Sequence, residues 1–108
     1  MGFFDFLRQP DINKGVMEYR NTDGAVLLDV RTPEEFAERH IPGAINIPNE
    51  TISTEEIPEL PNKDQLILVY CRSGNRSKQA SEKLAALGYT NIVEFGGIND
   101  WPGEIVTG

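Results

Sequence analysis

The fold is decided by residues 66–77, which read LILVYCRSGNRS. The first five form a continuous apolar run, as in a strand that is buried on both faces of a parallel sheet. The other seven are polar and contain a glycine, and they lead into a helical pattern. In that pattern Ala80, Leu84 and Leu87 share one face, and Gly88 ends it. This stretch therefore predicts a buried strand, a short loop and a helix.

The rest of the chain alternates helical and extended patterns on the same scale. Apolar residues at helical spacing cover 12–19, and short apolar runs of strand length cover 25–30, 44–47 and 92–95. Residues 49–63 carry prolines and glutamates and are expected to form a surface connection with a turn or two of helix. Such alternation predicts an α/β fold with a mostly parallel sheet and helices on both faces.

Three local signals place boundaries between these elements. Thr32 can cap a helix, Pro33 suits its first position, and Glu35 lies where the carboxylate of a capping box reaches back. The residues 41–43, Ile-Pro-Gly, should stop this helix early. The pair at 96–97, Gly-Gly, is interpreted as a tight turn after the last strand.

Composition excludes several classes of protein. The 108 residues suit one domain, expected at 1–108 with a core of about 11–103. Ten basic against 17 acidic residues give a net charge of −7, which argues against a nucleic-acid binder. The longest apolar run, 66–70, is far too short to span a membrane. One cysteine and one histidine allow no internal disulfide and argue against a cysteine-based zinc site, so we expect no metal and no cofactor.

The cysteine content also bears on the compartment. A single cysteine is not typical of a disulfide-stapled secreted protein. Residues 1–7, MGFFDFL, lack the basic start and long apolar stretch of a signal peptide, and they miss the myristoylation pattern. We therefore expect a cytoplasmic protein.

The loop after the strand at 66–70 contains the residues suited to catalysis. Ligands of open α/β sheets bind beyond the carboxyl ends of the strands, and Cys71 lies at such an end. A loop that turns from a strand into a helix directs successive backbone N–H groups at one point, which makes a cradle for an anion. Gly74 allows a positive φ there, and Ser73 or Ser77 can cap the following helix.

A thiol in such a cradle should be acidic, because thiolates at helix N-termini near arginine have lowered pKa values. Residues 72–83 carry four basic side chains and one acidic one, so positive charge gathers where an anionic substrate would arrive. The alternative is that Cys71 is an inert core residue after a buried strand. The polar sequence that follows favours a reactive thiol, provided that solvent can reach it and that the main-chain amides point at the sulfur.

The size of the loop separates two chemistries. Protein tyrosine phosphatases place five residues between the cysteine and the arginine, whereas here the arginine is Arg76, one position earlier, and Ser77 follows. A shorter cradle should fit tightly around one sulfur atom and be cramped around a phosphoryl group. The spacing favours transfer of sulfur rather than phosphorus.

Four motifs in this order resemble the single-domain rhodaneses, the thiosulfate sulfurtransferase family. They are LLDVR at 27–31, HIPGA at 40–44, CRSGNRS at 71–77 and GGINDW at 96–101. One departure is Arg39, where many members have glycine before the histidine. The resemblance implies a parallel five-stranded sheet with flanking helices.

The resemblance also implies a two-step transfer through a cysteine persulfide. Cys71 would take the outer sulfur of a small anionic donor such as thiosulfate, and cyanide or a thiol, which can belong to a protein, would accept it. Backbone N–H groups of the loop would stabilise the persulfide, while Arg72 and Arg76 attract the donor. The expected substrate-binding residues are Arg72, Ser73, Gly74, Asn75, Arg76 and Ser77, with Cys71 as the catalytic nucleophile.

Other matched residues are interpreted as structural. Asp29 and Arg31 should form a stabilising pair, His40 is not needed as a base for an ionised thiol, and Trp101 should cover the core. Three alternatives stay open: a persulfide relay between proteins, a phosphatase or arsenate reductase on the same fold, and a non-catalytic binding module.

Overall fold

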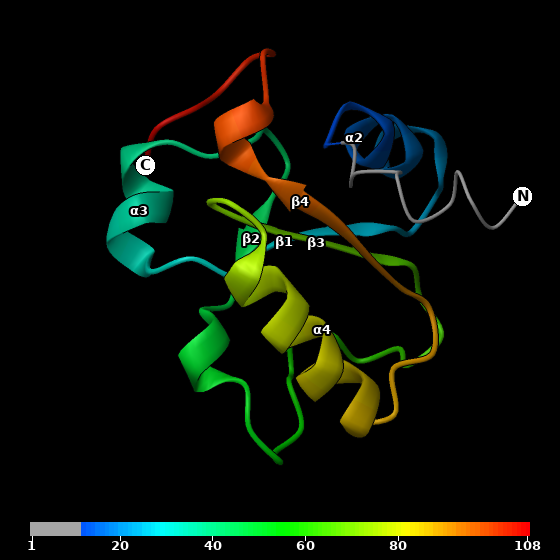
Figure 1. Ribbon diagram of the computed structural model, residues 1–108. Helices are drawn as coiled ribbons and strands as arrows, with labels where there is room; N and C mark the ends of the chain where they lie inside the picture. Colours follow the sequence, from blue (N-terminus) through cyan, green and yellow to red (C-terminus); the bar gives the residue numbers. More distant parts are fainter. Residues whose placement is uncertain (1–11) are drawn as a thin grey trace, which may run out of the picture.

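The computed structural model describes residues 12–108, so the N-terminal segment considered above and the first residue of the expected core lie outside the described residues. Figure 1 shows the helices and strands in chain order. The helices are α2 (Ile12–Asn21), α3 (Pro33–Glu38) and α4 (Asn75–Ala86), and the strands are β1 (Val26–Asp29), β2 (Ile45–Asn46), β3 (Ile67–Cys71) and β4 (Ile92–Gly97). Two short 3₁₀ turns follow strands: η1 (Asn49–Thr51) and η2 (Ile98–Asp100).

The strands form one parallel sheet in the order β2-β1-β3-β4. The chain leaves β1 toward one edge of the sheet and leaves β3 toward the other, so the carboxyl ends of β1 and β3 meet where the strand order reverses. The α/β class is as predicted, but the described residues form four strands and not five. The number five came from the family resemblance, whereas the apolar runs had indicated four strands.

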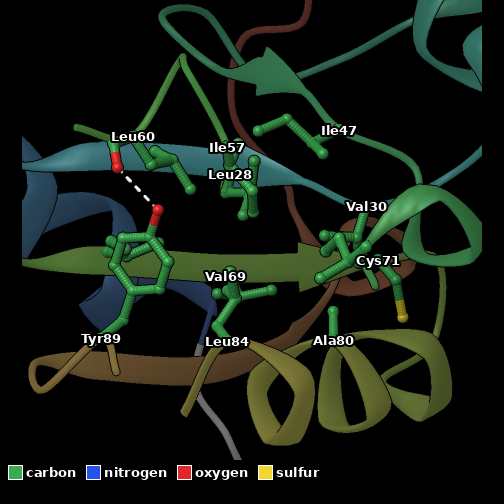
Figure 2. Packing of buried hydrophobic residues seen from close by; sticks show 12 residues of the cluster. Leu28, Val30, Ile47, Ile57, Leu60, Val69, Cys71, Ala80, Leu84 and Tyr89 are labelled. Atoms are coloured by element: carbon green, nitrogen blue, oxygen red, sulfur yellow. Dashed lines mark hydrogen bonds between the residues drawn. The ribbon is translucent and has the colours of Figure 1, made fainter. Parts of the chain in front are cut away.

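Two buried clusters lie on the two faces of this sheet. Alternate strand residues point to opposite faces, so Leu28 belongs to one cluster and its neighbour Leu27 to the other. The first cluster packs against α4 (Figures 1 and 2), and the second packs against α2. Helices therefore cover both faces, as the sequence predicted, and none of the helices in the described residues is long and apolar enough to cross a membrane.

The pairing of β3 with β4 is irregular next to the carboxyl end of β3. Val69 pairs with Glu94 but Cys71 pairs with Gly97, so β4 contributes one extra residue to the interval. Gly96 takes a φ of 108° there, a backbone conformation that is strained for any residue with a side chain. The prediction of a tight turn at 96–97 was wrong, because both glycines belong to the strand and the chain turns only afterwards.

The start of α3 follows the predicted capping box. The Thr32 hydroxyl accepts the backbone N–H of Glu35 at 3.2 Å, and the Glu35 carboxylate accepts the backbone N–H of Thr32 at 3.0 Å. These two bonds satisfy donors that a helix N-terminus otherwise leaves unpaired. They also fix the position of the Glu35 carboxylate, which matters for the site below.

Candidate active site

Cys71 is the last residue of β3, and the loop that follows it enters α4 directly. Gly74 stands at the N-cap of α4 with a φ of 115°, and no side chain caps this helix. Glycine adopts this left-handed conformation without the strain that a Cβ would add. The prediction that Ser73 or Ser77 caps the helix was wrong. The Ser77 hydroxyl instead bonds the carbonyl oxygen of Gly74 at 2.9 Å.

The Cys71 sulfur contacts two polar groups of the residues that follow it. The backbone N–H of Gly74 donates to Sγ at 2.9 Å, and the Ser77 hydroxyl lies 3.5 Å from Sγ. Burial raises the pKa of the Cys71 thiol, but hydrogen bonds from Ser77 and from the backbone at Gly74 and Ser73 outweigh burial and lower the pKa below its ordinary value. The Gly74 N–H thus points at the sulfur, as the sequence analysis required.

Accessibility of the thiol differs from the expectation. Only 1% of Cys71 is exposed, and Gly74 and Ser77 are buried beside it, whereas Arg72 and Ser73 are exposed. Figure 2 shows the sulfur at the end of β3 beside the helix that carries Ala80. The sequence could show that the loop is polar but not that it closes over the sulfur. A substrate can reach Sγ only if residues of this loop move.

The loop is closed from the other side by β4 and η2. The backbone N–H of Asn99 donates to the carbonyl oxygen of Arg72 at 3.2 Å. A Cβ placed on Gly97 would collide with the backbone of Arg72 and Ser73. Gly97 is therefore required by this close approach and not by its φ of −137°, which any residue adopts.

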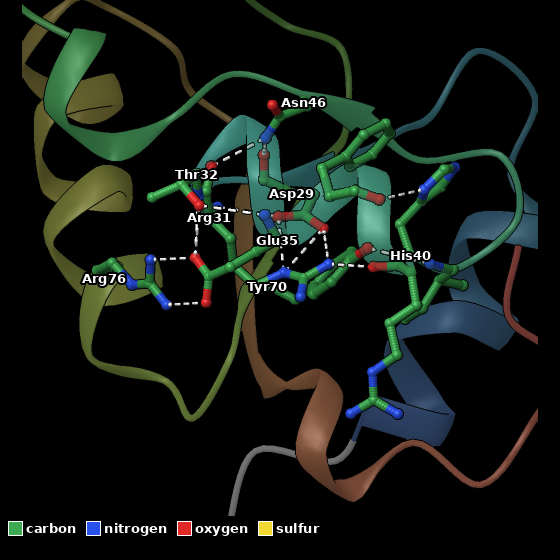
Figure 3. A network of polar contacts seen from close by, with 11 residues as sticks. Asp29, Arg31, Thr32, Glu35, His40, Asn46, Tyr70 and Arg76 are labelled. Carbon is green, nitrogen blue, oxygen red and sulfur yellow. Dashed lines mark hydrogen bonds and ion pairs between the residues drawn. The ribbon is translucent and has the colours of Figure 1, made fainter. Parts of the chain in front are cut away.

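The two arginines of the loop differ in their partners. Arg76 forms a double hydrogen bond with the Glu35 carboxylate, at 2.7 and 3.1 Å (Figure 3). The Glu35 carboxylate of α3 thus largely neutralises the charge of Arg76. Arg72 is exposed and forms no ion pair within residues 12–108. Of the two, Arg72 is the one left available to attract an anion.

A polar hollow lies beside this loop. Its lining includes exposed Arg72 and Arg39 together with Glu35 and Glu38 of α3 and Asn99 after β4. The part of the chain that the structure describes contains no group of three or more His, Cys, Asp or Glu side chains placed to hold a metal ion. The hollow thus brings exposed arginines and two glutamates together beside the loop.

A sequence model of the rhodanese-like domain matches residues 13–104 of this chain. The chain belongs to the rhodanese-like domain family. The resemblance that the four motifs indicated is thus confirmed over most of the chain.

Relatives of this rhodanese carry the activity in their names. Thiosulfate sulfurtransferase PspE of Escherichia coli (strain K12) is 40% identical over 73 residues, covering 68% of this chain and 70% of that protein. Thiosulfate sulfurtransferase GlpE of Pseudomonas entomophila (strain L48) is 33% identical over 91 residues, covering 80% and 82%. The solved structure described as rhodanese with anions from E. coli has a TM-score of 0.70 and 37% identity, covering 78% of this chain and 99% of that one. The chain is a rhodanese-type sulfurtransferase.

A buried ion pair joins Asp29 and Arg31 at the end of β1, and Arg31 also lines the polar hollow. The Arg31 guanidinium bonds both carboxylate oxygens of Asp29, at 2.7–3.1 Å, and both side chains are almost wholly buried (Figure 3). Burial lowers the pKa of Arg31, but its bonds to Asp29 outweigh burial and raise the pKa above its ordinary value. Asn46 donates to the carbonyl oxygens of both residues at 3.0 Å. The network fixes the end of β1 against β2.

His40 and Trp101 also have structural contacts. The His40 ring stacks on Phe36 with centroids 3.7 Å apart, and its Nδ1 lies 2.8 Å from the Phe36 carbonyl oxygen. The backbone of His40 forms an antiparallel bridge with Val106. Trp101 packs against the second core cluster and donates from its indole to the Glu104 carbonyl oxygen at 2.8 Å.

Two carboxylates near the rhodanese loop were not predicted as part of the site. Glu35 was expected only as a capping residue, yet it also holds Arg76. Glu94 was taken as an ordinary strand residue, yet it accepts the Ser77 hydroxyl at 2.7 Å. The one available signal was a charged residue inside an apolar strand, which requires a polar partner when the strand is covered.

Proposed function

We propose that this rhodanese transfers a sulfane sulfur through a persulfide on Cys71. The thiolate attacks the outer sulfur of thiosulfate, a new S–S bond forms, the S–S bond of thiosulfate breaks and sulfite leaves with its electron pair. A thiol or cyanide then attacks the outer persulfide sulfur. The Cys71 thiolate is released, and the product is an acceptor persulfide or thiocyanate.

The observation that carries this proposal is the 2.9 Å hydrogen bond from the Gly74 backbone N–H to Sγ. With the loop closed, this backbone donor stabilises negative charge on the sulfur from a fixed direction. Together with Ser77 it lowers the thiol pKa despite burial, which supports a thiolate as the nucleophile. The names of the relatives support thiosulfate as donor.

Entry of the donor is assigned to the polar hollow beside the loop. Exposed Arg72 and Arg39 line it, and a dianion is attracted there in a chain of net charge −7. Because Cys71 is buried, we expect the loop from Arg72 to Ser77 to open for each transfer. A thiol that must stay reduced favours the cytoplasm as the place of reaction.

The test is intact mass spectrometry of the protein after incubation with thiosulfate. We expect the mass to increase by one sulfur atom, and cyanide should remove that atom as thiocyanate. Sulfate is the matched control, because it is a dianion of similar size without a sulfane sulfur. The Cys71→Ser variant should neither gain mass nor turn over.

Two results would contradict the proposal. Gain of a sulfur atom by Cys71→Ser would place the transfer elsewhere in the chain. If the wild-type protein gains no mass during long incubation with thiosulfate, both thiosulfate as the donor and the persulfide on Cys71 are ruled out.

A further inference from the structure

The Ser77 hydroxyl has more acceptors around it than it has protons. Its Oγ lies 2.7 Å from a carboxylate oxygen of Glu94, 2.9 Å from the Gly74 carbonyl oxygen and 3.5 Å from the Cys71 sulfur. Ser77 is fully buried on α4, away from the protein surface. A hydroxyl has one proton to donate, and therefore only one of the three acceptors can receive it strongly at a time.

Glu94 is the strongest of these acceptors. A charged acceptor makes a shorter and stronger hydrogen bond than a neutral one, and this bond is the shortest of the three. The same carboxylate oxygen also accepts the backbone N–H of Gly96 at 2.9 Å, at the irregular pairing of β4. The carboxylate is thus held at a fixed point next to Ser77. Its strand pairs with β3, which carries the thiol.

We propose that Glu94 is a positioning residue that competes with the Cys71 sulfur for the Ser77 proton and so limits the acidity of the thiol. The inference rests on the proposed function, in which Cys71 is the nucleophile. While the thiol is protonated, its S–H points to Ser77 Oγ and the Ser77 O–H points to Glu94. When the thiol has lost its proton to solvent, the Ser77 hydroxyl turns to the sulfur, and Glu94 keeps only the Gly96 N–H.

The charged groups around the thiol act in different ways. Arg76 from α4 is electrostatically coupled to Cys71 and favours the thiolate, although Glu35 from α3 already pairs with it. Arg72 adjoins the thiol in the loop and is exposed. Glu94 from β4 is the carboxylate bonded to a side chain that itself contacts the sulfur. It therefore opposes the thiolate through Ser77.

The test is the pKa of the Cys71 thiol, measured from the ultraviolet absorbance of the thiolate with Cys71→Ser as the blank. This readout needs no reagent to reach the buried sulfur. In Glu94→Gln the amide oxygen can still accept the Gly96 N–H, but as a neutral acceptor it holds the Ser77 proton less strongly, so the hydroxyl turns more readily to the sulfur. We expect the thiol pKa to fall by about 0.5 to 1 pH unit, the equivalent of one hydrogen bond.

Two further variants separate a hydrogen bond from the charge of Glu94. Glu94→Asp keeps the charge but is shorter by one methylene, so it should lower the thiol pKa as Glu94→Gln does. In a Ser77→Ala background, which itself should raise the thiol pKa, Glu94→Gln should change little. Glu82→Gln removes one carboxylate from the exposed side of α4 and should leave the thiol pKa unchanged.

The outcomes are distinct from those of the proposed function. An unchanged or raised thiol pKa in both Glu94 variants would overturn the inference, as would an equal fall in the Ser77→Ala background. Sulfur loading from thiosulfate is measured separately by mass. Its loss would count against the proposed function but would not affect the comparison of thiol pKa values between the wild type and the Glu94 variants. If the proposed function and this inference are both correct, the pH profile of sulfur loading shifts to lower pH in Glu94→Gln by the same amount as the thiol pKa.

Discussion

Gly97 sets the distance between the reactive loop and the sheet. Its missing side chain leaves room for the carbonyl of Arg72, which also accepts the Asn99 N–H. Cys71 is the strand partner of Gly97, so any displacement of the loop there moves the amides that surround the sulfur. A glycine of the neighbouring strand thereby controls the geometry around the thiol.

Substitution of Gly97 by alanine should remove activity without unfolding the protein. The new Cβ collides with the backbone of Arg72 and Ser73, so the loop shifts away and the Gly74 N–H no longer points at the sulfur. We expect sulfurtransferase activity to fall about tenfold to a hundredfold. Steady-state kinetics with thiosulfate and cyanide measure the loss.

Gly24→Ala is the matched control for this substitution. Gly24 has a φ of 79° and open space around it, so alanine strains only the backbone there. It should cost about 1 kcal/mol of stability and leave activity intact. Equal activity in Gly97→Ala and Gly24→Ala would contradict the role given to Gly97.

The first turn of α3 connects two elements that the chain separates widely. Glu35 caps α3 through Thr32 and also holds Arg76 at the start of α4. The hydrogen bond from Arg76, with those from Thr32, lowers the pKa of Glu35 from 4.5 to about 2 against the opposing effect of burial. A single carboxylate thus joins the carboxyl-terminal ends of β1 and β3.

Acid should release this connection within a defined range of pH. A carboxyl with a lowered folded-state pKa stabilises the fold above its unfolded pKa, and that stability is lost as pH falls through the folded value. The free energy of unfolding should therefore decrease between pH 4.5 and about 2 in the wild-type protein. Glu35→Gln should be less stable at neutral pH, by about 1 kcal/mol. Its free energy of unfolding should also change less with pH in that range. Urea denaturation at each pH measures both.

Glu34→Gln provides the control for Glu35. Glu34 is the neighbouring exposed carboxylate of the same turn and makes no hydrogen bond or ion pair within the described residues. Its variant should keep the acid dependence of the wild type. The assignment to Glu35 fails if Glu35→Gln loses stability with acid as steeply as the wild type does.

The elements differ in how well the sequence predicted them, and the difference has a physical cause. The start of α3 was predicted correctly because its capping residues are adjacent and their bonds are local. The turn assigned to 96–97 was wrong because the irregular pairing of β4 arises only against β3. The contacts of Glu35 with Arg76 and of Glu94 with Ser77 span 41 and 17 residues, and no local pattern contains them. The contact of the Gly74 N–H with the Cys71 sulfur was predictable because one short loop contains both groups.

Charge is unevenly arranged over the molecule as a whole. The chain is acidic overall, and Arg76 is paired with α3, yet Arg72 and Arg39 are exposed at the polar hollow without ion pairs within residues 12–108. Small dianions should therefore be drawn to this one region against the average repulsion of the surface. Such long-range attraction weakens as salt is added.

Removal of the Arg72 charge should raise the KM for thiosulfate. We expect Arg72→Ala to increase it about twofold to fivefold at low salt, the size of one exposed charge interaction, and to reduce the dependence of KM on ionic strength. Initial rates over a range of salt concentrations measure both effects. Arg20→Ala, an exposed arginine on α2, should behave as the wild type. An unchanged salt dependence in Arg72→Ala would show that donor capture does not use this charge.

The lone cysteine has a further consequence for the fate of the loaded enzyme. Because these 108 residues contain no second thiol, nothing within them can resolve the persulfide into a disulfide. In the proposed mechanism the extra sulfur therefore stays on Cys71 until an outside nucleophile removes it. Turnover without an acceptor should accordingly stall after a single stoichiometric burst of sulfite.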